Sequence, residues 1–163
     1  MTFLQLCYRV FAPKKPEPYY ARYSILKILW IPLRKHFNVF IIPNTPFNCL
    51  RILLYRMVGY KIGKKVFIGM RCYLDDLEPR NIHIHDNVVI SYGVYFALHG
   101  KNQSHTHIHI KSNAYIGMAA RLIGRKEGLV IGENAIVAAG SIVIRNIPDG
   151  ETHAGNPAKK INS

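Results

Sequence analysis

The chain has 163 residues, enough for one domain with a sizeable core and too few for two. Hydrophobic residues make up 49% and charged residues 19%, a balance that excludes wholesale disorder. Lysine and arginine outnumber aspartate and glutamate by 22 to 9. The excess is concentrated in residues 1–65, which hold twelve basic residues and a single acid, Glu17. The basic character therefore belongs to an N-terminal segment.

No apolar run reaches the about 20 residues that a transmembrane helix needs. A run over residues 25–33 is interrupted by Lys27 and Pro32, and residues 1–10 lack the basic-then-apolar layout of a secretory signal. Three widely spaced cysteines without a CxxC pair argue against a disulfide framework and against a thiolate zinc site. We therefore expect a reducing, cytoplasmic setting.

Residues 1–60 predict a basic segment with two helices, one over residues 20–33 and one over residues 46–58. In the second helix we expect Leu50, Ile52, Leu53, Leu54, Met57 and Val58 on the apolar side, opposite Arg51 and Arg56. Two interpretations stay open. Basic amphipathic helices suit an anionic membrane surface, and helices could also cover the open end of the domain that follows. No nucleic-acid-binding module is recognisable, so no nucleic acid is expected as a partner.

From residue 62 onward, a branched aliphatic residue or phenylalanine recurs every six residues, in four triplets. The triplets are Ile62, Ile68, Leu74; Ile84, Ile90, Phe96; Ile110, Ile116, Leu122; and Ile131, Val137, Val143. This period predicts a triangular coil in which each hexapeptide forms one short strand and one tight turn, with about 18 residues in each coil. The aliphatic side chains should point inward and stack on their equivalents in neighbouring coils.

Two further positions of the repeat carry a pattern. Four places after most of the aliphatic residues stands a side chain of modest size, such as Cys72 or Ala120, which we expect at a corner. The residue that follows the aliphatic one is often glycine, as at positions 63, 69, 117 and 132. We expect that glycine supplies the backbone geometry that the corner demands.

Extra residues separate the triplets. The step along the sequence is ten residues from Leu74 to Ile84, fourteen from Phe96 to Ile110, and nine from Leu122 to Ile131, where the regular step is six. The surplus must leave the coil as loops, which often carry chemistry in such scaffolds. The first surplus lengthens its coil to 22 residues and should place Asp75 and Asp76 one coil below residues 97 and 98. The longest insertion, residues 97–109, contains His99, His105, His107 and His109.

Two segments resemble a known superfamily: Ile-Gly-Glu-Asn-Ala-Ile-Val-Ala-Ala-Gly-Ser at residues 131–141 and Gly-Asn-Pro-Ala-Lys at residues 155–159. They are similar to the hexapeptide-repeat acyltransferases. Together with residues 91–99, they most resemble the maltose and galactoside O-acetyltransferases and the polysaccharide O-acetyltransferases. The resemblance implies a mainly β fold, a left-handed parallel β-helix shaped as a triangular prism. The expected organisation is a helical cap over 1–60, a catalytic β-helix over 61–148, and a tail over 149–163 that contributes to coenzyme A binding.

The resemblance implies that His99 is the general base, because a neutral imidazole can accept the proton of a sugar hydroxyl during attack on a thioester. Asp75 and Asp76 could orient that imidazole or bind the acceptor, and they could equally be solvated loop acids. His105 could touch substrate from within the insertion. Transfer is expected to be direct, without a covalent enzyme intermediate.

Acetyl-CoA is the co-substrate that the resemblance implies, lying along the groove between adjacent coils. Small residues would allow its pantetheine to approach the main chain, and cations would meet its phosphates. The candidate residues are Ala119, Ala120, Ala138, Ala139, Gly140, Arg145, Asn156, Pro157, Ala158, Lys159 and Lys160.

The resemblance further implies a homotrimer with active sites between subunits and a saccharide acceptor from surface polysaccharide assembly. The protein would be cytoplasmic, with a peripheral position on the inner face of the membrane as an open alternative. Other functions also stay open: N-acylation of an amino sugar, acetylation of a small molecule, a zinc enzyme of the γ-carbonic-anhydrase type, and a non-catalytic assembly module. We expect no metal, because His105, His107 and His109 alternate along one strand, whereas zinc ligands in that class come from neighbouring coils and subunits.

Overall fold

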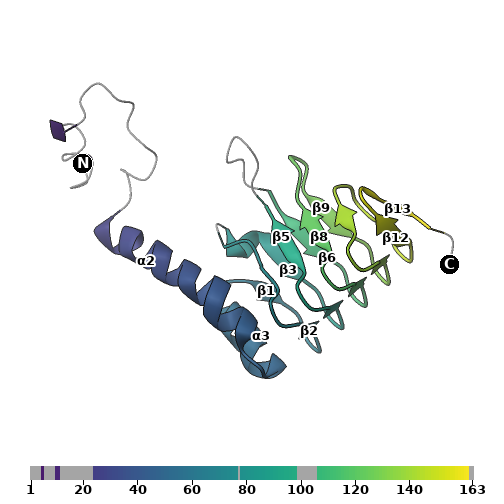
Figure 1. The fold of residues 1–163 in the computed structure, drawn as a ribbon, viewed down its shortest axis with the longest axis horizontal. Coiled ribbons are helices and arrows are strands. Elements are labelled where there is room, and N and C mark those ends of the chain that lie inside the picture. The colour runs from purple at the N-terminus through teal and green to yellow at the C-terminus, as the bar shows by residue number, and fades with distance from the viewer. Residues whose placement is uncertain (1–4, 6–9, 12–23, 77, 99–105, 162–163) are drawn as a thin grey trace. The chain divides into compact units, whose positions relative to one another are not determined.

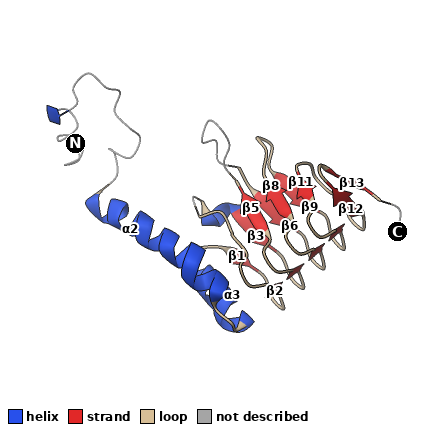
Figure 2. Ribbon diagram, viewed as in Figure 1, coloured by secondary structure: helices blue, strands red, loops and turns tan. Residues whose placement is uncertain are grey.

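The structure is a computed structural model that describes residues 5, 10–11, 24–76, 78–98 and 106–161, without the side chains of residues 27 and 28. It confirms the predicted fold class, a mainly β structure in which a parallel β-helix follows a short helical segment (Figures 1 and 2). The chain divides into two compact units, residues 1–37 and residues 38–163.

The first unit contains helix α2 (Ile25–His36), which lies close to the range predicted from the sequence. The second unit begins with a π-helical turn η2 (Phe37–Ile41, which starts at the unit boundary) and a 3₁₀ turn η3 (Ile42–Asn44). Helix α3 (Asn48–Val58) follows and ends at Gly59, whose left-handed conformation (φ 117°) lets its N–H bond the last carbonyls. Of the two predicted helices, only α3 is in the same unit as the β-helix.

The β-helix has three sheets, one on each side of the triangular prism (Figure 2). Sheet 1 contains β1 (Lys61–Ile62), β3 (Ile82–Ile84), β6 (Ile108–Ile110) and β9 (Leu129–Ile131). Sheet 2 contains β2 (Phe67–Ile68), β4 (Val89–Ile90), β7 (Tyr115–Ile116), β10 (Ile136–Val137), β12 (Thr152–Gly155) and β13 (Ala158–Lys160). Sheet 3 contains β5 (Tyr95–Ala97), β8 (Arg121–Ile123) and β11 (Ile142–Val143). Neighbouring strands are parallel, except for the antiparallel β12–β13 hairpin.

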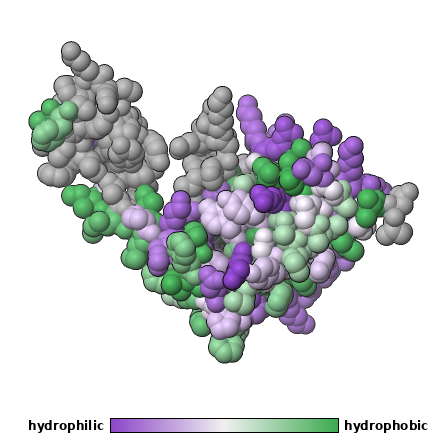
Figure 3. Space-filling view, in the orientation of Figure 1, coloured by the Kyte–Doolittle hydropathy of each residue, from purple (hydrophilic) through white to green (hydrophobic). Residues whose placement is uncertain are grey.

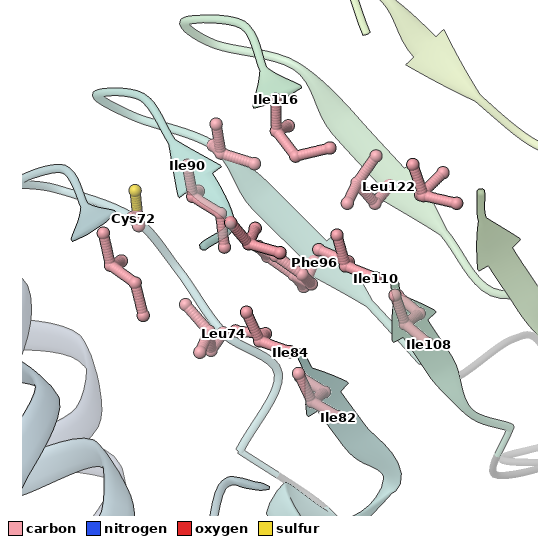
Figure 4. Packing of buried hydrophobic residues seen from close by; sticks show 14 of the residues in the cluster. Cys72, Leu74, Ile82, Ile84, Ile90, Phe96, Ile108, Ile110, Ile116 and Leu122 are labelled. Carbon is pink, nitrogen blue, oxygen red and sulfur yellow. The ribbon is translucent and has the colours of Figure 1, made fainter. Parts of the chain in front are cut away.

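The core is built from the predicted inward-pointing residues. Eleven of the twelve residues in the four triplets are buried, and the twelfth, Ile62, is partly buried against the others. Figure 4 shows how these side chains from successive coils stack on one another. The modest side chains at the corners are buried too, among them Cys72 and Ala120, each 0% exposed. Each coil therefore shares its apolar interior with its neighbours.

The strand register matches the expected insertions. Ile62 pairs with Ile84, Ile84 with Ile110, and Ile110 with Ile131, which are steps of 22, 26 and 21 residues. The additional residues all leave the prism where sheet 3 passes into sheet 1, in residues 74–81, 98–107 and 124–128. This edge, which we call the insertion corner, includes the short 3₁₀ turn η4 (Pro79–Asn81).

The role expected for the recurring glycines is wrong, and a different physical reason replaces it. Gly69 and Gly117 are not among the residues with positive φ. A Cβ atom on Gly117 would instead lie 2.5 Å from the backbone nitrogen of Ala139, and one on Gly69 would lie 2.6 Å from the backbone of Ser91. These positions need glycine because the next coil passes too closely for any side chain. The left-handed corner positions are occupied mainly by other residues, including Asn113 and Ala119.

Helix α3 packs on the first coil through polar side chains. Arg51, only 2% exposed, donates from Nε to the carbonyl of Ile68 at 2.8 Å, and the hydroxyl of Tyr55 donates to the carbonyl of Cys72 at 3.1 Å. Asn48 accepts a hydrogen bond from the N–H of Ile68 at 3.0 Å. Among the described residues no strand precedes the first coil, and these side chains satisfy its edge.

The predicted orientation of α3 is therefore wrong in part. Arg51 points into the molecule, whereas three residues of the predicted apolar side face solvent: Leu50 (43% exposed), Leu53 (53%) and Met57 (75%). Ile52 packs into the core from this helix, as the sequence predicted, but the neighbouring coil edge also offers carbonyl oxygens, which a guanidinium can bond and a leucine cannot.

Candidate functional site

The insertion corner brings together the residues on either side of the longest loop. The N–H of Thr106 donates to the carbonyl of Leu98 at 3.1 Å and closes the base of the loop. Residues 99–105 lie outside the described part of the chain, and these include two predicted site residues, His99 and His105. The geometry that supports the loop is described on both sides of it.

Asp75 holds the residue that precedes His99 in the sequence. Its Oδ2 accepts a hydrogen bond from the backbone N–H of Leu98 at 2.7 Å, and both residues are buried. The neighbouring pairing of Tyr73 with Tyr95 sets this contact between two adjacent coils. Asp75 therefore lies one coil from the start of the loop, at the place given by the 22-residue step.

The backbone at Asp75 is itself held by hydrogen bonds from Tyr60 and Asn38. The hydroxyl of Tyr60 lies 2.9 Å from the carbonyl oxygen of Leu74 and 3.1 Å from that of Asp75. The amide nitrogen of Asn38 donates to the same Leu74 carbonyl at 2.6 Å. Burial raises the pKa of Tyr60 well above its usual range, so its hydroxyl remains protonated and able to donate.

Asp76 is held by an aromatic pair. Its Oδ1 accepts a hydrogen bond from the hydroxyl of Tyr73 at 2.9 Å, and the ring of Tyr73 stacks on that of Tyr95 with centroids 4.5 Å apart. Burial, and then the carboxylate of Asp76, raise the pKa of Tyr73 above its usual range. Both aspartates are buried and hydrogen-bonded, so neither is a freely solvated loop acid.

The three insertions are also linked to one another. Asn81 of the first insertion donates from its side chain to the carbonyl of Thr106 at 3.1 Å. The hydroxyl of Thr106 donates to the carbonyl of Arg125 in the third insertion at 2.6 Å. The N–H of Gly124 bonds the carbonyl of Ala97 at 2.8 Å. These bonds give the long loop a fixed platform at its base.

Predicted coenzyme A residues line the corner between sheets 2 and 3. Ala119 and Gly140 occupy equivalent left-handed positions in adjacent coils, and a Cβ on Gly140 would meet no atom within 4 Å. Ala139 is exposed and Ala138 is partly exposed, so main chain is accessible there. The methyl of Ala120, by contrast, is buried in the core and does not face this surface. Small side chains and open main chain fit an extended ligand with amide groups.

The other predicted coenzyme A residues belong to the C-terminal hairpin and the loop before it. Asn156 and Pro157 are exposed at the turn between β12 and β13, Ala158 is half-buried, and Arg145 and Lys159 are exposed. The ammonium of Lys160 pairs with Glu151 at 2.8 Å. Bonds from Lys160 and then from His153 lower the pKa of the Glu151 carboxyl. Lys159 and Arg145 are therefore better placed than Lys160 to meet an anionic ligand.

The histidines of sheet 1 form a separate group. The rings of His83 and His109 stack with centroids 4.4 Å apart, and His107 meets His109 edge-on at 4.9 Å. Within the described residues, no group of three or more His, Cys, Asp or Glu side chains is arranged to hold a metal ion.

Sequence reasoning missed Asn38, Tyr60, Tyr73 and Thr106. None of the four belongs to the six-residue pattern of aliphatic residues. Tyr73 directly precedes the inward Leu74, and Thr106 falls within an insertion. The repeat therefore predicts where these two residues lie, but not which hydrogen bonds they form. Asn38 and Tyr60 act through main-chain carbonyls, which leave no signal in the sequence.

The comparisons with known proteins agree with this architecture. The family described as "Hexapeptide repeat of succinyl-transferase" matches residues 60–96. A Staphylococcus aureus protein, SACOL2570, which its name assigns provisionally to the acetyltransferases, is 34% identical over 109 residues. The match covers 62% of this chain and 53% of that protein, so the chain spans about half the length of this relative. The chain is therefore similar to hexapeptide-repeat acetyltransferases over its β-helix.

Solved structures of acetyltransferases share the fold of this chain. The hexapeptide-repeat acetyltransferase VCA0836 of Vibrio cholerae superposes with a TM-score of 0.67 at 22% identity, covering 84% of this chain and 92% of its own. That protein has also been solved with acetyl coenzyme A. A galactoside acetyltransferase in complex with coenzyme A superposes with a TM-score of 0.65 at 21% identity, covering 83% and 82%. The β-helix and its helical segment are thus a known architecture.

Proposed function

We propose that this hexapeptide-repeat protein is an acetyl-CoA-dependent O-acetyltransferase in which His99 is the general base. The observation that carries the proposal is the hydrogen bond that the N–H of Leu98, next to His99 in the chain, donates to the buried Asp75 carboxylate. A fixed main chain at Leu98, closed by the bond from Thr106, supports a loop that must position an imidazole reproducibly.

The chemistry assigned to His99 is proton transfer. The neutral imidazole accepts the proton of the acceptor hydroxyl while that oxygen bonds to the acetyl carbon, and the carbon–sulfur bond then breaks. The imidazolium of His99 returns the proton to the departing sulfur, so that the residue ends neutral. Acetyl-CoA supplies the activated thioester. Asp75 takes the role of a positioning residue, because it acts through the main chain of Leu98.

Coenzyme A would be held by two groups of residues. The N–H groups of Ala119 and Gly140 already bond the neighbouring coil, so the exposed main chain at Ala119, Ala139 and Gly140 would offer carbonyl oxygens to the amides of pantetheine, and a Cβ at Gly140 has free space around it. The exposed cations of Arg145 and Lys159 would meet the phosphates. Solved relatives that hold acetyl coenzyme A or coenzyme A on the same fold support this assignment.

The acceptor that we propose is a sugar hydroxyl in the assembly of a surface polysaccharide. The galactoside acetyltransferase among the structural neighbours supports a sugar. An amino sugar or a small alcohol is the competing acceptor class. We further propose a homotrimer with active sites between subunits, located in the cytoplasm, with membrane contact through the basic N-terminal segment.

The experiment measures release of free coenzyme A from acetyl-CoA with a panel of neutral sugars, amino sugars and small alcohols. We expect turnover with a neutral sugar, and a loss of about 100-fold or more in the His99→Gln variant with the melting temperature retained. The matched control is His36→Gln, which removes one imidazole from α2. Undiminished transfer by His99→Gln, or transfer to none of the acceptors by the parent protein, would overturn the proposal.

A further inference from the structure

The two helices near the N-terminus each leave an apolar stripe uncovered. In α2 the stripe consists of Ile25 (52% exposed), Leu26 (79%), Leu29 (64%), Trp30 (54%) and Leu33 (48%). These residues recur at intervals of three and four, so they share one face of the helix. Figure 3 shows apolar side chains on the surface of the helical region. Such contiguous exposed leucine and tryptophan side chains mark a contact surface.

Helix α3 presents a second stripe on the side away from the β-helix. Phe47 (67% exposed), Leu50 (43%), Leu53 (53%) and Met57 (75%) follow the same helical spacing. The opposite side of α3 is fully engaged, because Arg51 and Tyr55 bond the first coil. The outward stripe is therefore not needed for packing within this unit.

Charge distinguishes between the surfaces that could cover these stripes. Residues 24–65 contain eight lysines and arginines and no acid, and Arg34, Lys35 and His36 lie in the last turn of α2. A second copy of this chain would bring an equally basic segment against the first, and the two would repel each other. Nucleic acid would satisfy the charge but would leave the leucines without an apolar partner. An anionic lipid surface satisfies both features.

We propose that α2 and the outer face of α3 are interfacial helices that bind an anionic lipid bilayer. The apolar stripes enter the boundary between head groups and acyl chains, and the exposed basic side chains, Lys35 among them but not the buried Arg51, face the lipid phosphates. The 12 residues of α2 extend about 18 Å, short of the roughly 30 Å hydrocarbon core. Accordingly, none of the helices within the described residues is long and apolar enough to cross a membrane. The membrane contact does not depend on acetyl transfer.

The chain carries its own probe for the test. Trp30 is the only tryptophan and lies in the α2 stripe. The protein is titrated with vesicles of phosphatidylcholine containing about a quarter phosphatidylglycerol, and with vesicles of phosphatidylcholine alone. We expect the Trp30 emission to shift to shorter wavelength with the anionic vesicles, and bromine-labelled acyl chains to quench it. Raising the salt from about 0.1 M to about 1 M should weaken the initial attraction.

Variants distinguish the contribution of the apolar stripes to lipid binding from the effect of a change in net charge. Leu26→Glu and Leu53→Glu should each lower the vesicle partition coefficient by about tenfold or more. Each substitution replaces a leucine that would enter the bilayer on binding with a charged side chain. The matched control is Ile136→Glu on β10, whose side chain is 43% exposed, and it should bind like the parent.

Three results would overturn the lipid assignment: no spectral shift with anionic vesicles, equal binding by the leucine variants, or tighter binding to a duplex oligonucleotide than to the vesicles. A Trp30 emission that is already at short wavelength in the free protein and does not change would assign the stripe to the chain itself or to a second copy. Acetyl transfer to a soluble sugar is measured without vesicles, so failure of the enzyme assay and failure of lipid binding are distinct.

Discussion

The carboxylate of Asp75 and the backbone N–H of Leu98 meet at 2.7 Å, across two coils that are linked through the first insertion. Asp75 is 0% exposed and Leu98 is 1% exposed, so neither group has water as an alternative partner. A bond of this kind contributes chiefly through the cost of breaking it, because the orphaned partner remains buried. It also fixes the chain where the longest loop begins.

Asp75→Ala should therefore reduce both stability and transfer. We expect the free energy of unfolding to fall by about 1–3 kcal/mol, because the Leu98 N–H loses its acceptor. Asp75→Asn keeps a side-chain oxygen at the same place and should retain most of the stability. Urea unfolding and the rate of coenzyme A release measure the two effects. An Asp75→Ala protein that unfolds at the parent's urea concentration would show that the bond is dispensable.

Two glycines should respond differently to a side chain. Gly117→Ala places a Cβ against the main chain of the next coil and should cost about 1–3 kcal/mol. Gly140→Asn should cost less, because the position is open and Asn113 and Asn134 already take the same left-handed conformation. Melting temperatures of the two variants provide the comparison. A greater loss in Gly140→Asn would show that φ, not close approach, controls these turns.

The repeat could be predicted from the sequence because its signal is repeated. Each inward aliphatic residue is supported by the residues one coil away, so one misassigned position cannot shift the register. The same arithmetic predicted Asp75 and Asp76 one coil below residues 97 and 98, since insertions change the step by a known number of residues, and the bond from the Leu98 N–H to Asp75 lies in that region. Edges carry no such redundancy. The bonds from Asn48 and Arg51 to the first coil occur once, and a helix whose packed side mixes Arg51 with apolar residues is misread by an apolar pattern.

Arg51 should therefore be among the most sensitive positions of the second unit. Its guanidinium bonds the carbonyls of Ile68 and Thr45 while it is 2% exposed. Arg51→Met leaves those carbonyls without a donor and should lower the free energy of unfolding by about 3 kcal/mol. Arg56→Met, at an exposed position of the same helix, is the comparison and should cost less than half as much. Urea unfolding of both variants decides between a buried anchor and a dispensable contact.

Lys159 offers a test of the proposed coenzyme A surface. An exposed ammonium that meets a phosphate contributes about 1 kcal/mol, so Lys159→Ala should raise the KM for acetyl-CoA about fivefold. The value of kcat should stay near that of the parent, because the contact is the same before and during transfer. Lys126→Ala removes another exposed lysine, from the third insertion, and should leave the KM unchanged. Equal effects of both variants would indicate that only net charge matters.

Stability should fall as the pH falls, and sheet 1 is the cause. Burial is the largest cause that lowers the pKa of both stacked imidazoles below the ordinary value of 6.5. The second cause is the charge of Lys61 for His83, and the charge of His83 for His109. The remaining groups that face His109 are His107, His85 and Lys61. An unfolded chain has no such neighbours, so below about pH 6.5 it binds protons that the folded protein still excludes. Unfolding is therefore favoured progressively as the pH drops through this window, and the effect is absent above it.

The His109→Gln variant isolates this effect. It removes one ring of the stack and relieves His83, so the loss in melting temperature between pH 7.5 and pH 5 should be smaller than in the parent. His36→Gln makes the same substitution outside sheet 1 and should leave the loss unchanged. Scanning fluorimetry at a series of pH values measures all three proteins. If the His109→Gln protein loses as much stability as the parent, the stacked pair is not the cause of the acid sensitivity. The two imidazoles would then titrate in the folded protein as they do in the unfolded chain.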